Sequence, residues 1–133
     1  ETRPMQVAAL LFTALLFGGA VLFSFGFAAF LLKTLPTDVA RASIRRAFPY
    51  FYLFVLGVAA IASALLWPID RVSSLLMAFI AITVIPTRQQ LMPAINRATD
   101  AGNTERFKAL HGLSVGIELV HIVINAYVLV RFL

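Results

Sequence analysis

Near its C-terminal end the chain reads His111-Gly112-Leu113-Ser114-Val115-Gly116-Ile117-Glu118-Leu119-Val120-His121-Ile122-Val123-Ile124-Asn125, inside an apolar run long enough to cross a lipid bilayer. At about 100° per residue, the strongly polar side chains of this stretch share an arc of roughly 80° on a helix. We call them the polar stripe: His111, Ser114, Glu118, His121 and Asn125. An acid and two imidazoles are costly at membrane depth, so we expect the polar stripe to face a bundle interior or a partner.

Two glycines lie on another face of the same helix, about 150° from the polar stripe. These residues, Gly112 and Gly116, form the glycine face. Their spacing is the small-xxx-small pattern that lets two membrane helices approach each other closely. We therefore expect the glycine face to be a helix-packing surface.

Composition places the chain in the membrane class. The sequence is 61% hydrophobic and 13% charged, and its apolar residues come in long uncharged blocks. The net charge is +5, but the charges lie at the block ends, which suits anionic lipid headgroups better than nucleic acid. There are no cysteines, which excludes a disulfide, a thiolate metal site and a cysteine nucleophile. We expect membrane lipids as partners and no nucleic acid.

The uncharged blocks predict one all-α domain over residues 1–133, an integral membrane four-helix bundle. Its spans are expected at about residues 5–32, 50–67, 72–91 and 109–131. The first block would form a helix of about 42 Å, longer than a hydrocarbon core of about 30 Å, so it must tilt or project. Pro86 falls near the end of the third span, where it is expected to kink or loosen the helix.

Small residues recur at every fourth position in the first span. Ala20, Ser24 and Ala28 would lie on one face and allow a close helix approach. Chance is the alternative explanation, because alanine-rich spans produce such pairs often. We expect these three residues to pack against another helix.

The two longer connections are expected to hold amphipathic helices, at residues 37–48 and 93–108. In the first of these, Arg41, Arg45 and Arg46 would meet anionic lipid headgroups at the interface. The alternative is a solvated linker helix that docks on its own bundle. Both connections would lie on the cytoplasmic side.

Basic residues set the expected orientation through the positive-inside rule. The connections after spans one and three hold Lys33, Arg41, Arg45, Arg46, Arg88, Arg97, Arg106 and Lys108. The opposite side holds Arg3, Arg71 and Arg131. We therefore expect both termini on the periplasmic side of a bacterial cytoplasmic membrane.

Four landmarks carry a family resemblance. They are Leu35-Pro36, Phe48-Pro49-Tyr50-Phe51, Pro93-Ala94-Ile95-Asn96-Arg97 and the run from Arg106 to Ser114. In this order and spacing the chain resembles the small four-span membrane proteins that include transmembrane protein 205. The resemblance implies four membrane-spanning helices and a poorly defined biochemical role, linked in eukaryotic members to drug resistance and trafficking.

The resemblance extends to single residues of the last helix. Phe107, His111, Gly112, Ser114 and Asn125 match the family pattern. At Glu118 the relatives carry an amide, and none has a histidine at the place of His121. The role that this position shares with the family would therefore be hydrogen bonding. Proton or metal chemistry at Glu118 would be peculiar to this chain.

The spacing of Glu118 and His121 raises the question of a cofactor. Glu-x-x-His supplies half of a di-metal carboxylate site in helical bundles, but the other spans offer no carboxylate. Haem ligation by His111 or His121 and contact with a lipid or quinone stay open. No phosphate loop, nucleophile elbow or His-Glu-x-x-His motif occurs, so we expect no metal, no resident cofactor and no catalytic residues.

Two function classes remain. The polar stripe either bonds across the bundle, to Thr13, Ser24, Ser63, Thr83 or backbone, or serves proton relay. The first reading favours a non-catalytic accessory or scaffolding subunit bound to other membrane protein subunits, of which a respiratory or photosynthetic complex is one form. The second favours a small transporter or proton-coupled exporter that uses Glu118, His121 and Asn125.

Overall fold

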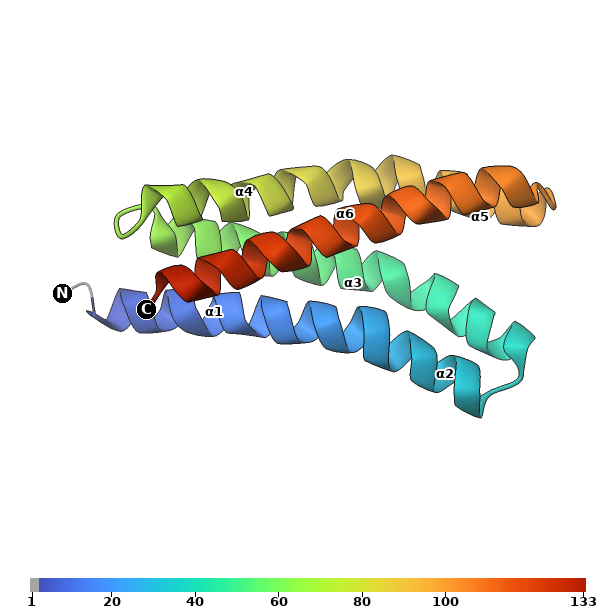
Figure 1. Cartoon of the computed structure of the whole chain (residues 1–133), viewed down its shortest axis with the longest axis horizontal. Coiled ribbons are helices and arrows are strands. Elements are labelled where there is room, and N and C mark those ends of the chain that lie inside the picture. Colours follow the sequence, from blue (N-terminus) through green and yellow to red (C-terminus); the bar gives the residue numbers. More distant parts are fainter. Residues whose placement is uncertain (1–2) are drawn as a thin grey trace.

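The computed structural model describes residues 3–133 and is all-helical over that range; residues 1–2 of the expected domain lie outside it. Four helical rods follow one another (Figure 1). The rods are α1 (Arg3–Val21), η1 (Leu22–Phe27) and α2 (Ala28–Thr34); α3 (Thr37–Leu66); α4 (Arg71–Pro86), η2 (Thr87–Leu91) and α5 (Met92–Asp100); and α6 (Thr104–Arg131). The expected fold class, a four-helix bundle, is confirmed.

The rods run up and down, so the connections gather at two ends of the bundle (Figure 1). The terminal end holds both chain ends and the turn at residues 67–70. The basic end holds the turns at residues 35–36 and 101–103, together with most of the lysines and arginines. Each rod has 28 to 32 residues and is apolar enough to span a membrane. The chain is thus an integral membrane protein whose rods exceed the roughly 30 Å of a hydrocarbon core.

Local sequence explains where each rod begins and ends. Pro36 has extended backbone (ψ 143°) and precedes the first turn of α3. Asp70 caps α4 by accepting a hydrogen bond from the Ser73 amide at 3.3 Å. Gly102 takes a positive φ of 67°, and the Asn103 side chain then caps α6 by accepting from the Arg106 amide.

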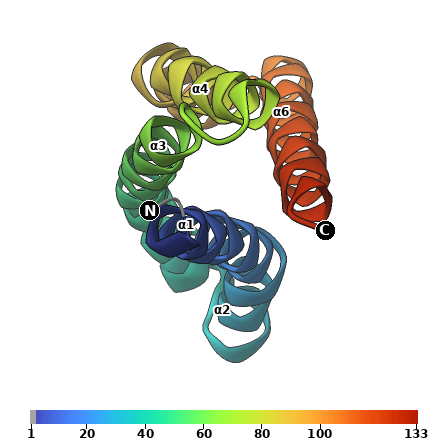
Figure 2. The same ribbon diagram turned by 90° about the vertical axis from the view of Figure 1, so that its left-hand side faces the viewer.

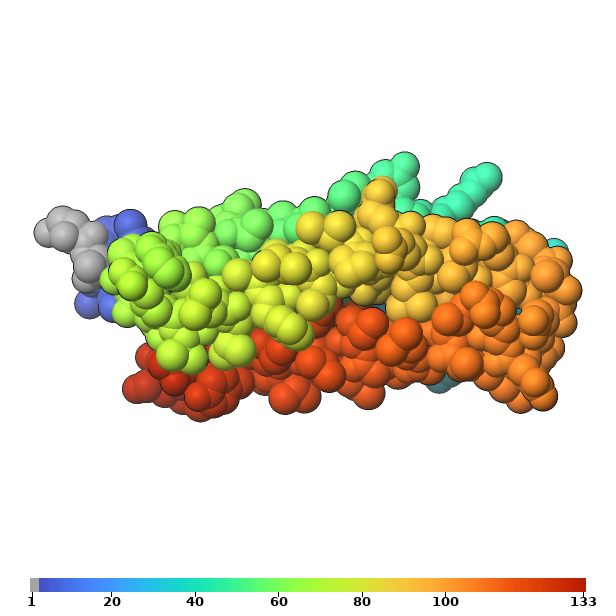
Figure 3. Space-filling view, turned by 90° about the horizontal axis from the view of Figure 1, so that it is seen from above, coloured from blue at the N-terminus to red at the C-terminus, as the bar shows by residue number. Residues whose placement is uncertain are grey.

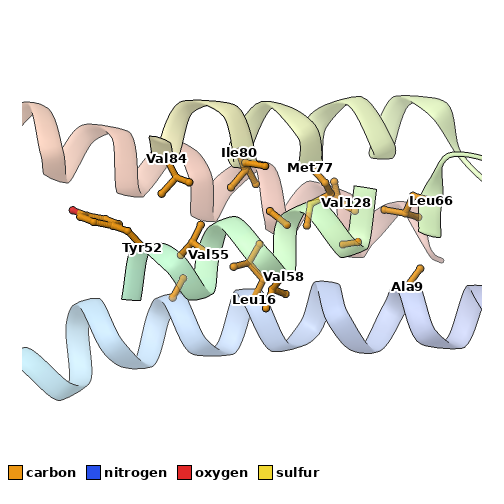
Figure 4. Packing of buried hydrophobic residues seen from close by; sticks show 14 of the residues in the cluster. Ala9, Leu16, Tyr52, Val55, Val58, Leu66, Met77, Ile80, Val84 and Val128 are labelled. Atoms are coloured by element: carbon orange, nitrogen blue, oxygen red, sulfur yellow. The ribbon is translucent and has the colours of Figure 1, made fainter. Parts of the chain in front are cut away.

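Apolar side chains from all four rods meet along the bundle axis, as Figure 4 shows for Leu16, Val58, Met77, Ile80 and Val128. The longest packed interface lies between α3 and α4, where Ser63 and Ser74 exchange hydrogen bonds of 2.7 and 2.8 Å with each other's carbonyls. These reciprocal bonds fix the rotation of α3 against α4 near the terminal end.

The helices surround the core as an arc in the order α1, α3, α4 and α6 (Figure 2). The last rod packs on α1, α4, η2 and α5, and runs beside α4 and α5 along their length (Figure 3). In contrast, α2 turns away from α6 and stays with α3 (Figure 2). Among the described residues, α2 therefore has no extensive contact with α6 at the basic end.

The expected interfacial helix at residues 37–48 is not a separate element, which corrects that prediction. It forms the first turns of α3, which continues through Pro49. A proline inside a helix removes one backbone hydrogen bond, but packed rings hold the two sides together. Phe48 and Phe51, either side of Pro49, lie 5.1 and 4.4 Å from the ring of Phe23. Arg88 also donates to the Pro49 carbonyl at 3.0 Å.

The second amphipathic segment, residues 93–108, is split between two helices. Its first part is α5, the end of the third rod, and its last part opens α6 after the Gly102 turn. Pro86 does loosen the third rod, because the π-helical segment η2 follows it directly. The change from apolar to polar sequence within the third rod is therefore not a break in the helix.

The small residues of the first rod face inward to different degrees. Ala20 is buried in the core, and Ser24 and Ala28 are half-buried. The ring of Phe54 on α3 packs against Gly19 of α1, where an added Cβ would come within 2.8 Å of the ring. The sequence pattern did not single out Gly19, and a larger residue there would require the Phe54 ring to move.

A bidentate ion pair joins the last turn of α6 to the α3–α4 turn at the terminal end. Arg131 donates from Nε to Asp70 Oδ2 at 2.9 Å and from Nη2 to Oδ1 at 3.0 Å. Ser73 Oγ donates to the same carboxylate at 2.7 Å. The Arg131 guanidinium and the Ser73 hydroxyl hold the pKa of Asp70 well below its usual range.

This pair predicts a loss of stability in acid. Because the folded state lowers the pKa of Asp70, the stabilisation is complete above the unfolded pKa of about 3.9 and is lost as the pH falls towards the folded value. We expect the thermal midpoint of wild-type protein in detergent to fall more between pH 6 and pH 3 than that of Asp70→Asn. Asp38→Asn, at an exposed carboxylate, is the control. Equal losses in wild type and Asp70→Asn would contradict the prediction.

Candidate intramembrane polar site

The polar stripe becomes steadily more buried from the basic end towards the middle of the bundle. His111 is exposed and stacks on Phe107 at 5.2 Å between ring centres. Ser114 and Glu118 are half-buried. His121 is 7% exposed and Asn125 is 2% exposed. The structure thus turns the inner part of the stripe into the bundle and leaves His111 outside it.

His121 bonds across the bundle to α4. Its Nε2 lies 2.7 Å from Thr83 Oγ1, which also lies 2.7 Å from the Phe79 carbonyl. The threonine hydroxyl has one proton, and the carbonyl can only accept. Both contacts are made at once when Thr83 donates to Phe79 and the His121 Nε2–H donates to Thr83. In that tautomer Nδ1 of the neutral ring remains as an acceptor.

Asn125 bonds across the bundle to α1. Its Nδ2 donates to the Thr13 carbonyl at 3.1 Å, and Thr13 Oγ1 in turn donates to the Ala9 carbonyl at 2.7 Å. The other amide atom, Asn125 Oδ1, is buried and has no hydrogen-bond partner among residues 3–133. A buried acceptor left unpaired costs about 1–3 kcal/mol, so this atom points to an additional polar group.

Glu118 lies between these two contacts and the open side of the bundle. Its carboxyl group is close to the Ser24 hydroxyl of η1, yet Ser24 Oγ is buried without a hydrogen bond to any described residue. The Tyr52 side chain of α3 is near Ser114 and Glu118. Glu118 makes no ion pair within residues 3–133.

A small pocket of about 10 Å³ lies at the centre of this group. It is lined by Leu16, Ala20, Val55, Ile80, Glu118, His121, Ile122 and Asn125. This is about the space that one water molecule needs. Every rod contributes to the wall. Sequence reasoning found the polar wall residues on α6 and, among the apolar ones, singled out only Ala20.

The geometry bears on the metal and haem alternatives. Within residues 3–133, no three histidine, aspartate or glutamate side chains come together as a metal site would require. The groups around Glu118 and His121 are hydroxyl, amide and phenol groups, and these suit hydrogen bonding. Ser63, one of the expected partners, bonds to Ser74 instead.

The glycine face does not pack within this chain, which corrects part of that expectation. Gly112 and Gly116 are exposed, and a Cβ added to either would find no described atom within 4 Å beyond the adjoining residues and backbone of its own helix. Apolar side chains that are 40–66% exposed surround them on α6: Leu113, Val115, Leu119, Val120 and Val123. This side of α6 faces lipid or another protein.

The arginines expected at lipid headgroups have different surroundings. Arg45 forms a bidentate pair with Asp100, with N–O distances of 2.8 and 2.9 Å, and so ties α3 to the end of α5. Arg41 and Arg46 are exposed and make no ion pair within the described range. The alternative of a helix docked on its own bundle therefore fits Arg45, and headgroup contact fits Arg41 and Arg46.

The His121–Thr83 contact gives a further prediction. Thr83→Val keeps the side-chain shape but leaves His121 Nε2 without a partner, so we expect the free energy of unfolding to fall by about 1 kcal/mol. Thr34→Val is the control, because the exposed Thr34 hydroxyl bonds only to its own helix at Phe30. Denaturant unfolding in micelles measures both. Equal effects of the two changes would contradict the assignment.

Comparison with known proteins gives one match. The sequence model of a family described as a domain of unknown function (DUF4149) matches residues 11–104. The matched stretch runs from α1 to the start of α6, so the polar stripe lies beyond it. No curated protein and no solved structure matches the chain. The resemblance to the transmembrane protein 205 family stays a prediction.

Proposed function

The chain belongs to the DUF4149 family, and from that premise we propose that it is a non-catalytic accessory or scaffolding subunit of a larger membrane assembly. Its partner is another membrane protein, which places a transmembrane helix on the glycine face of α6. A respiratory or photosynthetic complex is one form that such an assembly takes.

One observation carries this proposal: the glycine face has open space above it. A glycine inside a helix costs roughly 0.5–1 kcal/mol relative to alanine, and here no neighbour within residues 3–133 uses the space. In a membrane, glycines four residues apart let two helix backbones come into contact, and that contact offsets the cost. A second helix packed on α6 would use the close backbone approach that these glycines allow, whereas lipid chains would not need it.

The inward side of α6 supports the same proposal. His121 and Asn125 bond to α4 and α1, which fixes the rotation of α6 about its axis. The glycine face, on the opposite side, is thereby held outward at a constant position. We also propose that the basic end faces the cytoplasm of a bacterium, with both termini in the periplasm and with Arg41 and Arg46 at anionic headgroups.

Gentle solubilisation of native membranes followed by native electrophoresis and mass spectrometry tests the accessory role. We expect the chain to migrate with other membrane proteins at a fixed stoichiometry. Migration as a monomer or small homo-oligomer in every detergent that preserves known complexes of the same membrane would reject it.

A second candidate, a small proton-coupled transporter, is favoured by Glu118, His121 and Asn125, which line one small pocket inside the bundle. The two functions differ in their response to Glu118→Gln, which keeps the size and hydrogen bonding of the side chain but removes its titration. An accessory subunit should remain in its assembly with this change. A proton-coupled activity should be lost, as measured by substrate-dependent acidification in vesicles.

A further inference from the structure

We propose that the polar stripe forms a half-channel, a row of protic side chains that admits water from the basic end only. It brings water to Glu118 and to one water molecule in the 10 Å³ pocket, and it ends at Asn125. Glu118 then exchanges its proton with one compartment and not with the other. This inference does not depend on the accessory role.

The burial gradient along α6 is the first argument. Successive members of the stripe pass from exposed (His111) through half-buried (Ser114 and Glu118) to 7% and 2% exposed (His121 and Asn125). A stripe that only positioned helices would need no continuation to the surface. At the same end, α2 packs on α3 and has no extensive contact with α6.

The two unpaired buried atoms are the second argument. Asn125 belongs to the pocket wall and its Oδ1 lacks a partner, and Ser24 Oγ near Glu118 lacks one as well. A water in the pocket would donate to Asn125 Oδ1 and satisfy it, since the amide oxygen only accepts. The pocket has about the volume of one such molecule, and Glu118, His121 and Asn125 are the polar residues of its otherwise apolar wall.

The opposite end of the pocket is closed by apolar packing. The next residue of α6 on the same side is Val128, which is 0% exposed, and it packs with Leu66 and Met77 (Figure 4). The Asn125–Thr13 bond lies directly above this layer. This apolar layer separates Asn125 from a cavity of about 320 Å³ at the terminal end, whose wall includes Leu66, Asp70, Ser73 and Arg131.

The groups that face Glu118 are few. Tyr52 of α3 and His121 of α6 are titratable, and Ser24 of η1 supplies a hydroxyl group. Thr83 of α4 is bonded to His121. No lysine or arginine of the described chain pairs with Glu118. A closed end means that Glu118 binds protons without conducting them.

Thiol labelling tests this directly, because the natural chain has no cysteine. Ser24→Cys and Ser114→Cys are near-isosteric, and Ile82→Cys is the matched control at a lipid-exposed position, 65% exposed on α4. A membrane-impermeant methanethiosulfonate is added from either side of oriented vesicles. A thiolate reacts only where water reaches it. We expect both serine replacements to react from the basic end alone, at a rate at least about tenfold above Ile82→Cys.

Labelling of Ser24→Cys from the terminal end, from both ends, or no faster than Ile82→Cys would overturn the proposal.

Infrared spectroscopy of the wild-type chain tests the same proposal without any cysteine variant. The carboxyl band that Glu118→Gln deletes should shift to the carboxylate position when the pH is raised at the basic end of buffered, oriented vesicles, and should not shift when the pH is raised at the terminal end. A shift from the terminal end would refute one-sided access.

Discussion

Ala59→Leu is expected to lower the free energy of unfolding by about 3 kcal/mol, near the upper part of the range for overpacked cores. Ala59 is 0% exposed and belongs to the core where α3 meets its neighbours. It lies one turn before Ser63, which is bonded to Ser74 of α4. Three added carbon atoms have no space there, so either α3 and α4 separate or the serine pair breaks.

The adjacent residue supplies the control for this change. Ala60 is exposed on the same helix, so Ala60→Leu should alter stability by less than about 0.5 kcal/mol. Denaturant titration in micelles, followed by circular dichroism, measures both variants. A similar loss at the two positions would show that α3 is rotated differently about its axis.

Joint replacement of Gly112 and Gly116 by leucine is expected to release the chain from its assembly. Two leucines fill the space that a second helix would occupy, and separation of the backbones by even one side-chain layer removes close packing. Within the chain itself no described residue lies within 4 Å of either added Cβ. The isolated bundle should therefore unfold at the same denaturant concentration as wild type, or slightly higher because leucine is a better helix former.

Gly57→Leu is the matched change on α3, where the glycine is also exposed with open space above it. This variant should remain in the assembly on native electrophoresis, while the α6 double variant should not. If both variants remain assembled, the glycine face is a lipid surface. If both variants dissociate, a large side chain at any exposed glycine disrupts the assembly, and the glycine face of α6 has no special role.

Much of the fold could be predicted from the spacing of charges. Uncharged blocks, each followed by a turn signal, specify four membrane helices because backbone groups in lipid must bond within their own helix. The Gly102 turn and the Asn103 cap of α6 likewise depend on local chemistry. These features depend on neighbouring residues in the sequence, which is why they need no knowledge of the tertiary structure.

Features that depend on contacts between helices were not predictable. Pro49 resembles a helix start, but rings of Phe23, Phe48 and Phe51 from two rods hold α3 continuous through it. The same reasoning applies to the glycines. Gly19 meets Phe54 and Gly112 meets nothing among the described residues, although both belong to long apolar runs.

The candidate site likewise has features that the sequence predicted and features that only the tertiary structure shows. The periodicity of α6 placed five polar residues on one face, and the inner residues do turn inward. It did not show that His111 lies outside the bundle, nor that apolar residues of all four rods close a pocket beside Glu118. The partners Thr83 and Thr13 were among several possible hydroxyl or backbone groups, and only the relative rotation of the helices selects them.

The central claim is that α6 presents its glycine face to another membrane protein. Photo-crosslinking in native membranes tests it most directly, with a benzophenone amino acid at Val120 beside that face and, as the control, at Ile82 on α4; both positions are exposed. The account predicts a protein adduct of one constant mass from position 120 and lipid adducts alone from position 82. Lipid adducts alone from both positions would contradict it.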